Sequence, residues 1–181
     1  MIGAINQELS GKSLPLRLAE PHLAHITLHF LGETAPERAE LLQLALPPSL
    51  ASSRPFRLTT TTLGVFPNDR KPRVLWLGLD GDIGVLSAIH ATLSKTLRAY
   101  DFETETRAFL PHITLARTRE EAPGSFAADL ATVMASATMR EILDTGPQMF
   151  DVTEIELVRS HLGKSGSHYE TIRAFPLGRS R

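Results

Sequence analysis

The sequence predicts an α+β fold made of two similar lobes with antiparallel sheets. Strand-like and helix-like segments alternate along the 181 residues, and the order motif strand, helix, strand occurs loosely in each half. No glycine-rich phosphate fingerprint follows any expected strand, which argues against a doubly wound parallel sheet. No low-complexity tract or linker divides the chain. We therefore expect one two-lobed domain over residues 1–181.

Alternation of apolar and polar residues, together with prolines and glycines, sets the elements of the first half. The β-branched and apolar runs favour strands, whereas Pro36 suits the first turn of a helix that Pro47-Pro48 should stop. Residues 64–73 are dense in turn formers and basic side chains, which is typical of a loop. The expected strands are Leu14–Ala19, Ala24–Leu31 and the threonine-rich Phe56–Leu63.

The second half contains the clearest helical pattern, with apolar residues at helical spacing from Ile83 to Leu97 and an end near Tyr100. An alanine-rich stretch from Pro123 to Thr138 predicts another helix. The expected strands are Val74–Leu79, Phe109–Ala116, Met149–Arg159 and Tyr169–Leu177, the last two joined by a turn over Leu162–Ser167.

Composition excludes several classes of protein. The formal net charge is -1, which argues against a protein that coats nucleic acid but permits a local basic groove. The chain has no cysteine, so disulfides, thiol nucleophiles and thiolate metal sites are excluded. Met1–Lys12 lacks a signal-peptide pattern, and no apolar run approaches the roughly 20 residues that span a bilayer. We expect a cytoplasmic protein that does not bind membranes.

One four-residue motif occurs twice, as His25-Ile26-Thr27-Leu28 and as His112-Ile113-Thr114-Leu115. Both copies lie in apolar, β-branched runs. Because side chains alternate along a strand, each copy would bury its isoleucine and leucine and offer an imidazole and a hydroxyl on the opposite face. We interpret the pair as parts of one active site.

Two imidazoles on opposite sides of one bound group suit in-line displacement at phosphorus. The attacking and leaving oxygens are apical, so the base and the acid must lie on opposite sides. Histidine serves both roles because its unperturbed pKa is about 6.5. Threonine hydroxyls two residues further on can donate hydrogen bonds to the non-bridging oxygens. This chemistry requires neither a metal nor a cofactor.

The motif and its surroundings resemble the two-histidine (2H) phosphoesterases, and within them the RNA 2',3'-cyclic phosphodiesterase (2'-5' RNA ligase) branch. The resemblance runs from about residue 14 to 178. The similar segments are His25–Gly32, Leu63–Pro67, Arg73–Gly78, Pro111–Arg117, Ser160–Gly163 and Phe175–Leu177. It implies a bilobal α+β fold with pseudo-twofold lobes, one motif in each, antiparallel sheets lining a central cleft, and helices outside. It also implies metal-independent hydrolysis of 2',3'-cyclic phosphates, on RNA ends or nucleotides, to 2'-phosphates.

The resemblance also implies roles for individual residues. His25 and His112 would be catalytic, His25 as the acid on the leaving 3'-oxygen and His112 as the base on water. Thr27 and Thr114 would hold the phosphate, and Arg117 would add a charge-assisted contact. The family usually begins with a strand that is missing or altered here, because only about a dozen residues precede Leu14.

Alternatives remain for several residues and for the function. His22, His25 and His29 have helical spacing that could suggest a metal face, but no carboxylate cluster completes a ligand set. Phe66, beside the basic loop, could stack a base or belong to an exposed turn, whereas Trp76 lies in a run typical of a core. The same site run in reverse would act as a 2'-5' RNA ligase. A non-catalytic module that binds nucleotides or RNA ends is the third hypothesis.

Overall fold

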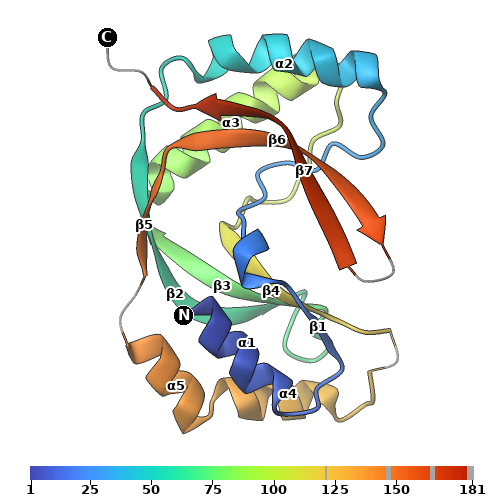
Figure 1. Ribbon diagram of the computed structural model, residues 1–181, viewed down its shortest axis with the longest axis vertical. Helices are drawn as coiled ribbons and strands as arrows, with labels where there is room; N and C mark the ends of the chain where they lie inside the picture. The colour runs from blue at the N-terminus through green and yellow to red at the C-terminus, as the bar shows by residue number, and fades with distance from the viewer. Residues whose placement is uncertain (121, 146–147, 164–165, 179–181) are drawn as a thin grey trace. The chain divides into compact units, whose positions relative to one another are not determined.

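The computed structural model describes residues 1–120, 122–145, 148–163 and 166–178. Within these ranges helices and strands are mixed, as expected of an α+β chain (Figure 1). The helices are α1 Ile2–Ser10, α2 Pro36–Leu50, α3 Ile83–Ala99, α4 Phe126–Met134 and α5 Ala137–Asp144, with a 3-10 turn at Pro21–Leu23. The strands are β1 Leu16–Leu18, β2 Phe56–Phe66, β3 Val74–Gly81, β4 His112–Thr118, β5 Met149–Val152, β6 Glu154–Gly163 and β7 Gly166–Pro176.

The chain forms two compact units, each assembled from separate segments. The first unit contains Met1–Thr27, Thr59–Gly81 and Pro111–Phe150, and the second contains Leu28–Leu58, Asp82–Leu110 and Asp151–Arg181. The units are therefore not the two halves of the sequence. His25 and Thr27 of the first motif and all of the second motif lie in the first unit. The expectation of one motif per lobe is wrong in this respect.

The strand pairs β1–β4, β3–β4 and β6–β7 are antiparallel. One sheet has the order β1-β4-β3-β2-β5, with β4 antiparallel to both β1 and β3. The other sheet consists of β6 and β7, which pair as an antiparallel hairpin. The turn expected over Leu162–Ser167 includes residues 164–165, which lie outside the described residues. Among the described helices, none is sufficiently long and apolar to cross a bilayer.

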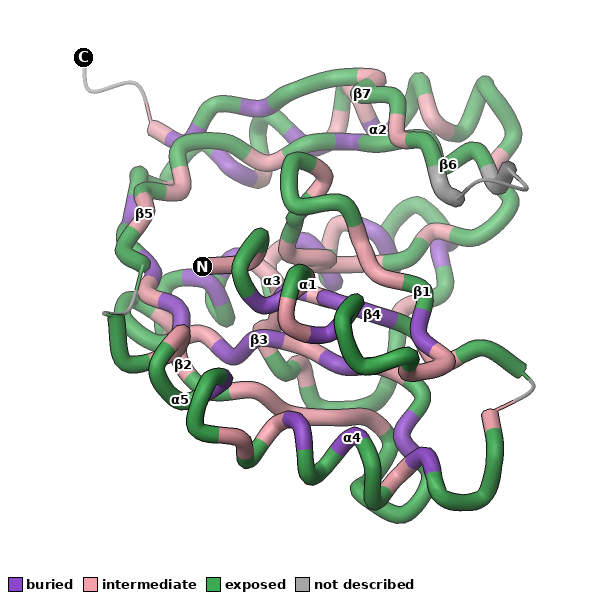
Figure 2. Tube along the Cα trace, turned by 60° about the horizontal axis from the view of Figure 1, so that its bottom comes forward, coloured by how far each residue is buried: buried purple, intermediate pink, exposed green. Residues whose placement is uncertain are grey.

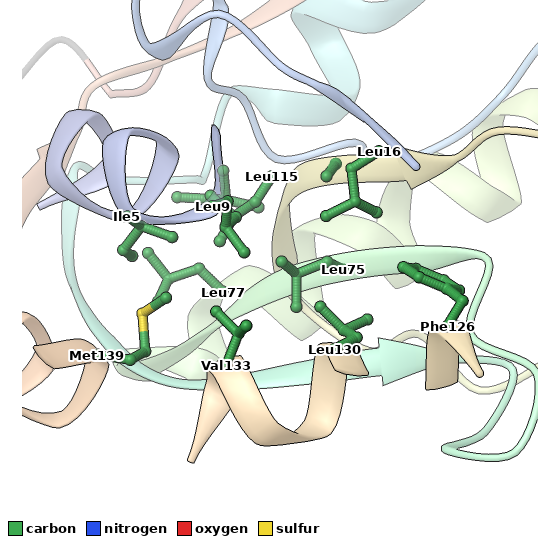
Figure 3. Packing of buried hydrophobic residues seen from close by; sticks show 12 residues of the cluster. Ile5, Leu9, Leu16, Leu75, Leu77, Leu115, Phe126, Leu130, Val133 and Met139 are labelled. Carbon is green, nitrogen blue, oxygen red and sulfur yellow. The ribbon is translucent and has the colours of Figure 1, made fainter. Parts of the chain in front are cut away.

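The core of the first unit lies between one face of β1, β4 and β3 and three helices (Figure 3). Alternate residues of the strands point into it, so partly buried and buried positions alternate from Val74 to Leu77 in β3 and from His112 to Leu115 in β4 (Figure 2). Helices α1, α4 and α5 cover this face with their apolar side chains. The buried members are Ile5, Leu9, Leu16, Leu75, Leu77, Ile113, Leu115, Ala116, Phe126, Leu130, Val133 and Met139.

In the second unit, helix α2 continues through Pro47 and Pro48 to Leu50, so the expectation that these prolines stop it is wrong. A proline cannot donate to the carbonyl four residues earlier, which for Pro47 belongs to Gln43. Arg173 of β7 supplies the missing donor, with its Nη1 3.1 Å from the Gln43 oxygen. This tertiary hydrogen bond therefore satisfies the carbonyl that Pro47 leaves without its helical donor.

Three further expectations about elements need correction. The first motif segment, Ala24–Leu31, is not a regular strand: Ile26 alone makes a β-bridge, because β1 already occupies the neighbouring stretch of the β4 edge. The helix expected over Pro123–Thr138 is two helices, since Ser136 caps α5 by accepting a hydrogen bond from the Met139 amide. The strand expected over Met149–Arg159 is interrupted at Thr153.

Candidate active site

The two motifs lie side by side in the first unit. Ile26 forms an antiparallel bridge with Ile113, and both isoleucines pack into the core. Carrying the antiparallel register one residue either way places His25 beside Thr114 and Thr27 beside His112. These four side chains therefore occupy the face opposite the core, related by an approximate twofold axis through the isoleucine pair.

Strand registers extend this arrangement across three neighbouring segments. The face opposite the core carries alternate residues of β3, of β4 and of the segment that pairs with the far edge of β4. Gly78 pairs with His112, Trp76 pairs with Thr114, and Arg117 pairs with both Val74 and Arg17. Extending the bridge of Ile26 with Ile113 by one residue adds Thr27 to the first of these sets and His25 to the second. We call this set of nine residues the motif face.

Arg117 reaches the motif face through a β-bulge. Trp76 pairs with Thr114 whereas Leu75 pairs with Ala116, so Leu115 is an extra residue on β4. Both Leu115 and Ala116 are consequently buried, at 0% and 1% exposure. Unbroken alternation from Thr114 would have directed Arg117 into the core. The bulge instead turns it to the side of Thr114, where it is exposed.

The ring of His112 lies in an aromatic corner formed by Phe66 and Trp76. Its centroid is 5.1 Å from that of Phe66, with the rings nearly perpendicular at 82°, and 6.2 Å from that of Trp76. The two aromatic rings are 5.2 Å apart. Trp76 therefore belongs to the motif face and not to the core, contrary to the expectation. The sequence signal for this placement was the position of Trp76 between Leu75 and Leu77 on a strand: both leucines are buried, so the residue between them points to the opposite face.

Two glycines allow Trp76 to lie in this position. A Cβ on Gly64 would overlap the six-membered ring of the indole and stand 2.6 Å from Cε2. A Cβ on Gly78 would stand 2.6 Å from Thr61 Oγ1 and 3.3 Å from Trp76 Cζ3. At Gly64 the overlap is with the indole itself, so this position requires glycine for the indole to rest on the strands as it does, whereas at Gly78 the shortest contact is with the Thr61 hydroxyl and the indole is only tightly approached.

His25 is oriented by its own backbone neighbourhood. Its Nδ1 lies 2.8 Å from the carbonyl oxygen of Leu23, the last residue of the 3-10 turn. A carbonyl only accepts hydrogen bonds, so Nδ1 carries the proton that it donates. The proton exchanged in acid or base chemistry would then be that of Nε2.

The basic loop follows Phe66, the last residue of β2, and its cationic residues are exposed. Asn68 organises it, because its side-chain oxygen accepts hydrogen bonds from the amides of Arg70 and Lys71 at 3.1 and 3.2 Å. The Arg73 amide donates to the Phe66 carbonyl at 2.6 Å and closes the loop. Phe66 thus lies on the motif side of the loop, against His112, while Arg70 and Lys71 face solvent.

The remaining histidines lie elsewhere. His29, stacked on His90 at 4.2 Å, and His161, 3.1 Å from Glu170, belong to the second unit. The helical spacing of His22, His25 and His29 has no structural counterpart, since the chain is extended after the 3-10 turn. Across the described ranges, no three histidine or acidic side chains gather as a metal-binding group.

The ring of His90 stacks on His29 at 4.2 Å and on Phe109 at 4.1 Å between centroids, and this stack predicts a pH-dependent stability. Burial lowers the pKa of His90 from 6.5, the nearby His29 lowers it further, and Glu105 opposes the shift. The unfolded chain therefore binds a proton at His90 more readily than the folded one, so stability should fall as the pH drops below about 6.5 and level off below the depressed pKa.

Replacing His90 with phenylalanine should flatten this part of the stability profile, because the ring stack is kept and the titrating group removed. Urea unfolding between pH 5 and 8 would measure it, with His22→Phe, at an exposed position, as the matched control. An unchanged slope in His90→Phe would contradict the assignment.

Similarity to known proteins establishes the family of the chain. Residues 7–164 match the 2'-5' RNA ligase superfamily. The chain belongs to this superfamily. An RNA 2',3'-cyclic phosphodiesterase of Aeropyrum pernix is 31% identical to this member over 94% of this chain and 92% of its own length. One of Archaeoglobus fulgidus is 30% identical over 94% and 89%.

Solved structures support the fold of this superfamily member. E. coli LigT, solved with 3'-AMP, superposes with a TM-score of 0.68 at 21% identity, covering 99% of this chain and 94% of LigT. At that identity the likeness concerns the fold. The sequence relatives extend the conclusion to the reaction class: the chain is an enzyme of the phosphodiesterase kind.

Proposed function

We propose that the protein hydrolyses 2',3'-cyclic phosphates, at RNA ends or on nucleotides, to 2'-phosphates by paired histidine catalysis. The observation that carries the proposal is the antiparallel pairing of Ile26 with Ile113, which brings two His-x-Thr units onto one face. The names of the relatives support the substrate class. We propose residues 1–181 as one two-lobed domain.

The reaction is an in-line displacement. Water attacks phosphorus as His112 removes its proton, the bond from phosphorus to the 3'-oxygen breaks, and His25 donates a proton through Nε2 to that oxygen. The backbone positions of His25 and His112 are diagonal neighbours across the strand pair, which places them roughly 7–8 Å apart. Two imidazoles that leave the same face at that spacing can reach one phosphate from two sides.

Other residues of the motif face bind and orient the substrate in this proposal. Thr27 and Thr114 donate hydrogen bonds to the non-bridging oxygens, where negative charge grows in the transition state. Arg117 adds positive charge beyond Thr114, and Phe66 offers a ring face to the nucleobase. The side chains of this proposal supply every proton transfer, so no metal or cofactor takes part.

The position of the product phosphate tests the proposal. Adenosine 2',3'-cyclic phosphate incubated with the enzyme should give adenosine 2'-phosphate, identified by phosphorus NMR against both standards. The rate should be unchanged by EDTA and bell-shaped in pH, because one ring must be neutral and the other charged. A 3'-phosphate product would show that the 2'-oxygen is the leaving group and would overturn the proposed role of the 3'-oxygen. Absence of turnover would overturn the proposed activity.

Ligation is the second candidate, favoured by the superfamily to which the chain belongs. A 5'-hydroxyl in place of water would attack the same phosphorus and give a 2'-5' linkage. Water is in large excess over any RNA 5'-hydroxyl, so hydrolysis should dominate by mass action. Incubation of tRNA half-molecules would detect any 2'-5'-linked product.

A further inference from the structure

Helix α2 is apolar on the side that faces away from the core of the second unit as well as on the side that faces it. Its inner side, with the buried Leu42, Leu46 and Leu50, packs on α3 and β7 (Figure 1). On the outer side Leu41 is 50% exposed and Leu44 is 71% exposed. A helix that covers a core with one side normally has a polar outer side. The apolar outer side of α2 therefore needs an explanation.

The outer side has the residue spacing of a coiled-coil seam. Leu41, Leu44, Pro48 and Ala51, which we call the outer stripe, follow one another at intervals of three, four and three residues, and all are exposed. At the helical rotation per residue they lie within about 40° of the direction opposite Leu46, the middle of the buried side. A seam of this spacing packs against one other helix, whose side chains insert between its own. The occupant that fits the outer stripe is therefore a helix.

Charges at the two ends of α2 identify the partner helix and its direction. Glu37 lies in the first turn and Arg54 follows the last turn. Both are exposed, and within the described ranges neither has an opposite charge at ion-pair distance. In an antiparallel pair of α2 helices, Leu44 of each copy packs against Pro48 of the other. This register brings Arg54 of each copy towards Glu37 of the other, whereas a parallel pair would place like charges together.

We propose that α2 is a homodimer interface, in which the outer stripes of two copies of this chain pair antiparallel about a twofold axis. Such an interface is isologous, because each copy supplies the same stripe and the same two charges. The 15 residues of α2 span about 22 Å. An interface of this size is small, so we expect the dimer to form in the micromolar range of concentration. No residue of the outer stripe belongs to the motif face, so the proposal is independent of the proposed function.

Sedimentation velocity over a range of protein concentrations tests the dimer. The apparent mass should rise from that of one chain towards twice that value as the concentration passes through the micromolar range. A mass that stays at that of one chain up to about 1 mM would overturn the proposal.

Substitution within the outer stripe tests the location of the interface. The double variant Leu41→Glu, Leu44→Glu should raise the dissociation constant by more than about 100-fold, because it places unpaired charges in the seam. Both side chains are exposed, so the unfolding midpoint of the monomer should change little. Met149→Glu is the matched control, since Met149 is an apolar residue of β5 in the first unit and is 63% exposed. A dimer that persists in the double variant, or that Met149→Glu also abolishes, would overturn the assignment to α2.

Exchange of the two charges tests the direction of pairing. Glu37→Arg and Arg54→Glu should each weaken the dimer by roughly 10-fold, because each places like charges together at both ends of the interface. The variant with both changes should return to within about 3-fold of the wild-type dissociation constant, since opposite charges meet again. It shares with Glu37→Arg the loss of an acid in the first turn, so it also controls for changes in helix stability. A dimer that stays weak in the doubly exchanged variant would overturn the antiparallel pairing.

Discussion

Replacing His112 with alanine should lower kcat for adenosine 2',3'-cyclic phosphate by roughly 10²- to 10⁴-fold, the range for loss of a general acid or base. The same loss is expected for His25→Asn. Asparagine can still donate a hydrogen bond to the Leu23 carbonyl, so the local turn is kept while the exchangeable Nε2 proton is removed. Both variants should remain folded, because neither imidazole is part of the buried core.

The pH profile gives this prediction a second readout. Each single variant should lose one limb of the bell, His112→Ala the limb that reports the base and His25→Asn the limb that reports the acid. Because the two groups act as a unit, the double variant should be little worse than either single one. His22→Ala, at an exposed histidine three residues before His25, is the matched control. More than a tenth of the wild-type kcat in either catalytic variant would contradict the paired mechanism.

Gly64→Ala should disturb the aromatic corner and, through it, the position of His112. The new Cβ would overlap the six-membered ring of Trp76, which lies 5.2 Å from Phe66 and 6.2 Å from His112. A rigid indole can relieve the overlap only by tilting. We expect a loss of about 1–3 kcal/mol in stability, as for other overpacked sites, together with a fall in kcat/KM.

Trp76 reports this change directly, because it is the only tryptophan of the chain. Its fluorescence emission should shift in Gly64→Ala. Gly84→Ala is the control, since a Cβ there meets nothing within 4 Å in the first turn of α3. That variant should gain about 0.5–1 kcal/mol and leave the emission unchanged. Wild-type emission and activity in Gly64→Ala would show that the corner does not depend on this glycine.

Local pattern was sufficient for most elements. The helix Ile83–Ala99 follows from apolar residues at helical spacing, and β3 follows from alternating Leu75 and Leu77. It was insufficient where a distant partner decides the outcome. Helix α2 passes Pro47 because Arg173 donates to Gln43, a contact that no local pattern contains. The first motif is extended but forms only one β-bridge, because β1 pairs with the neighbouring part of the edge of β4.

The sequence by itself determined the chemical identities of the proposed site: two histidines and two threonines, each pair spaced so that both side chains share one face of an extended segment. Tertiary structure decided which of these groups meet. The pairing of Ile26 with Ile113 sets the register of the motifs, and the bulge at Leu115 turns Arg117 to their side, opposite Arg17. Register and bulges arise from packing between segments distant in sequence, so they become visible only when the strands are placed beside one another.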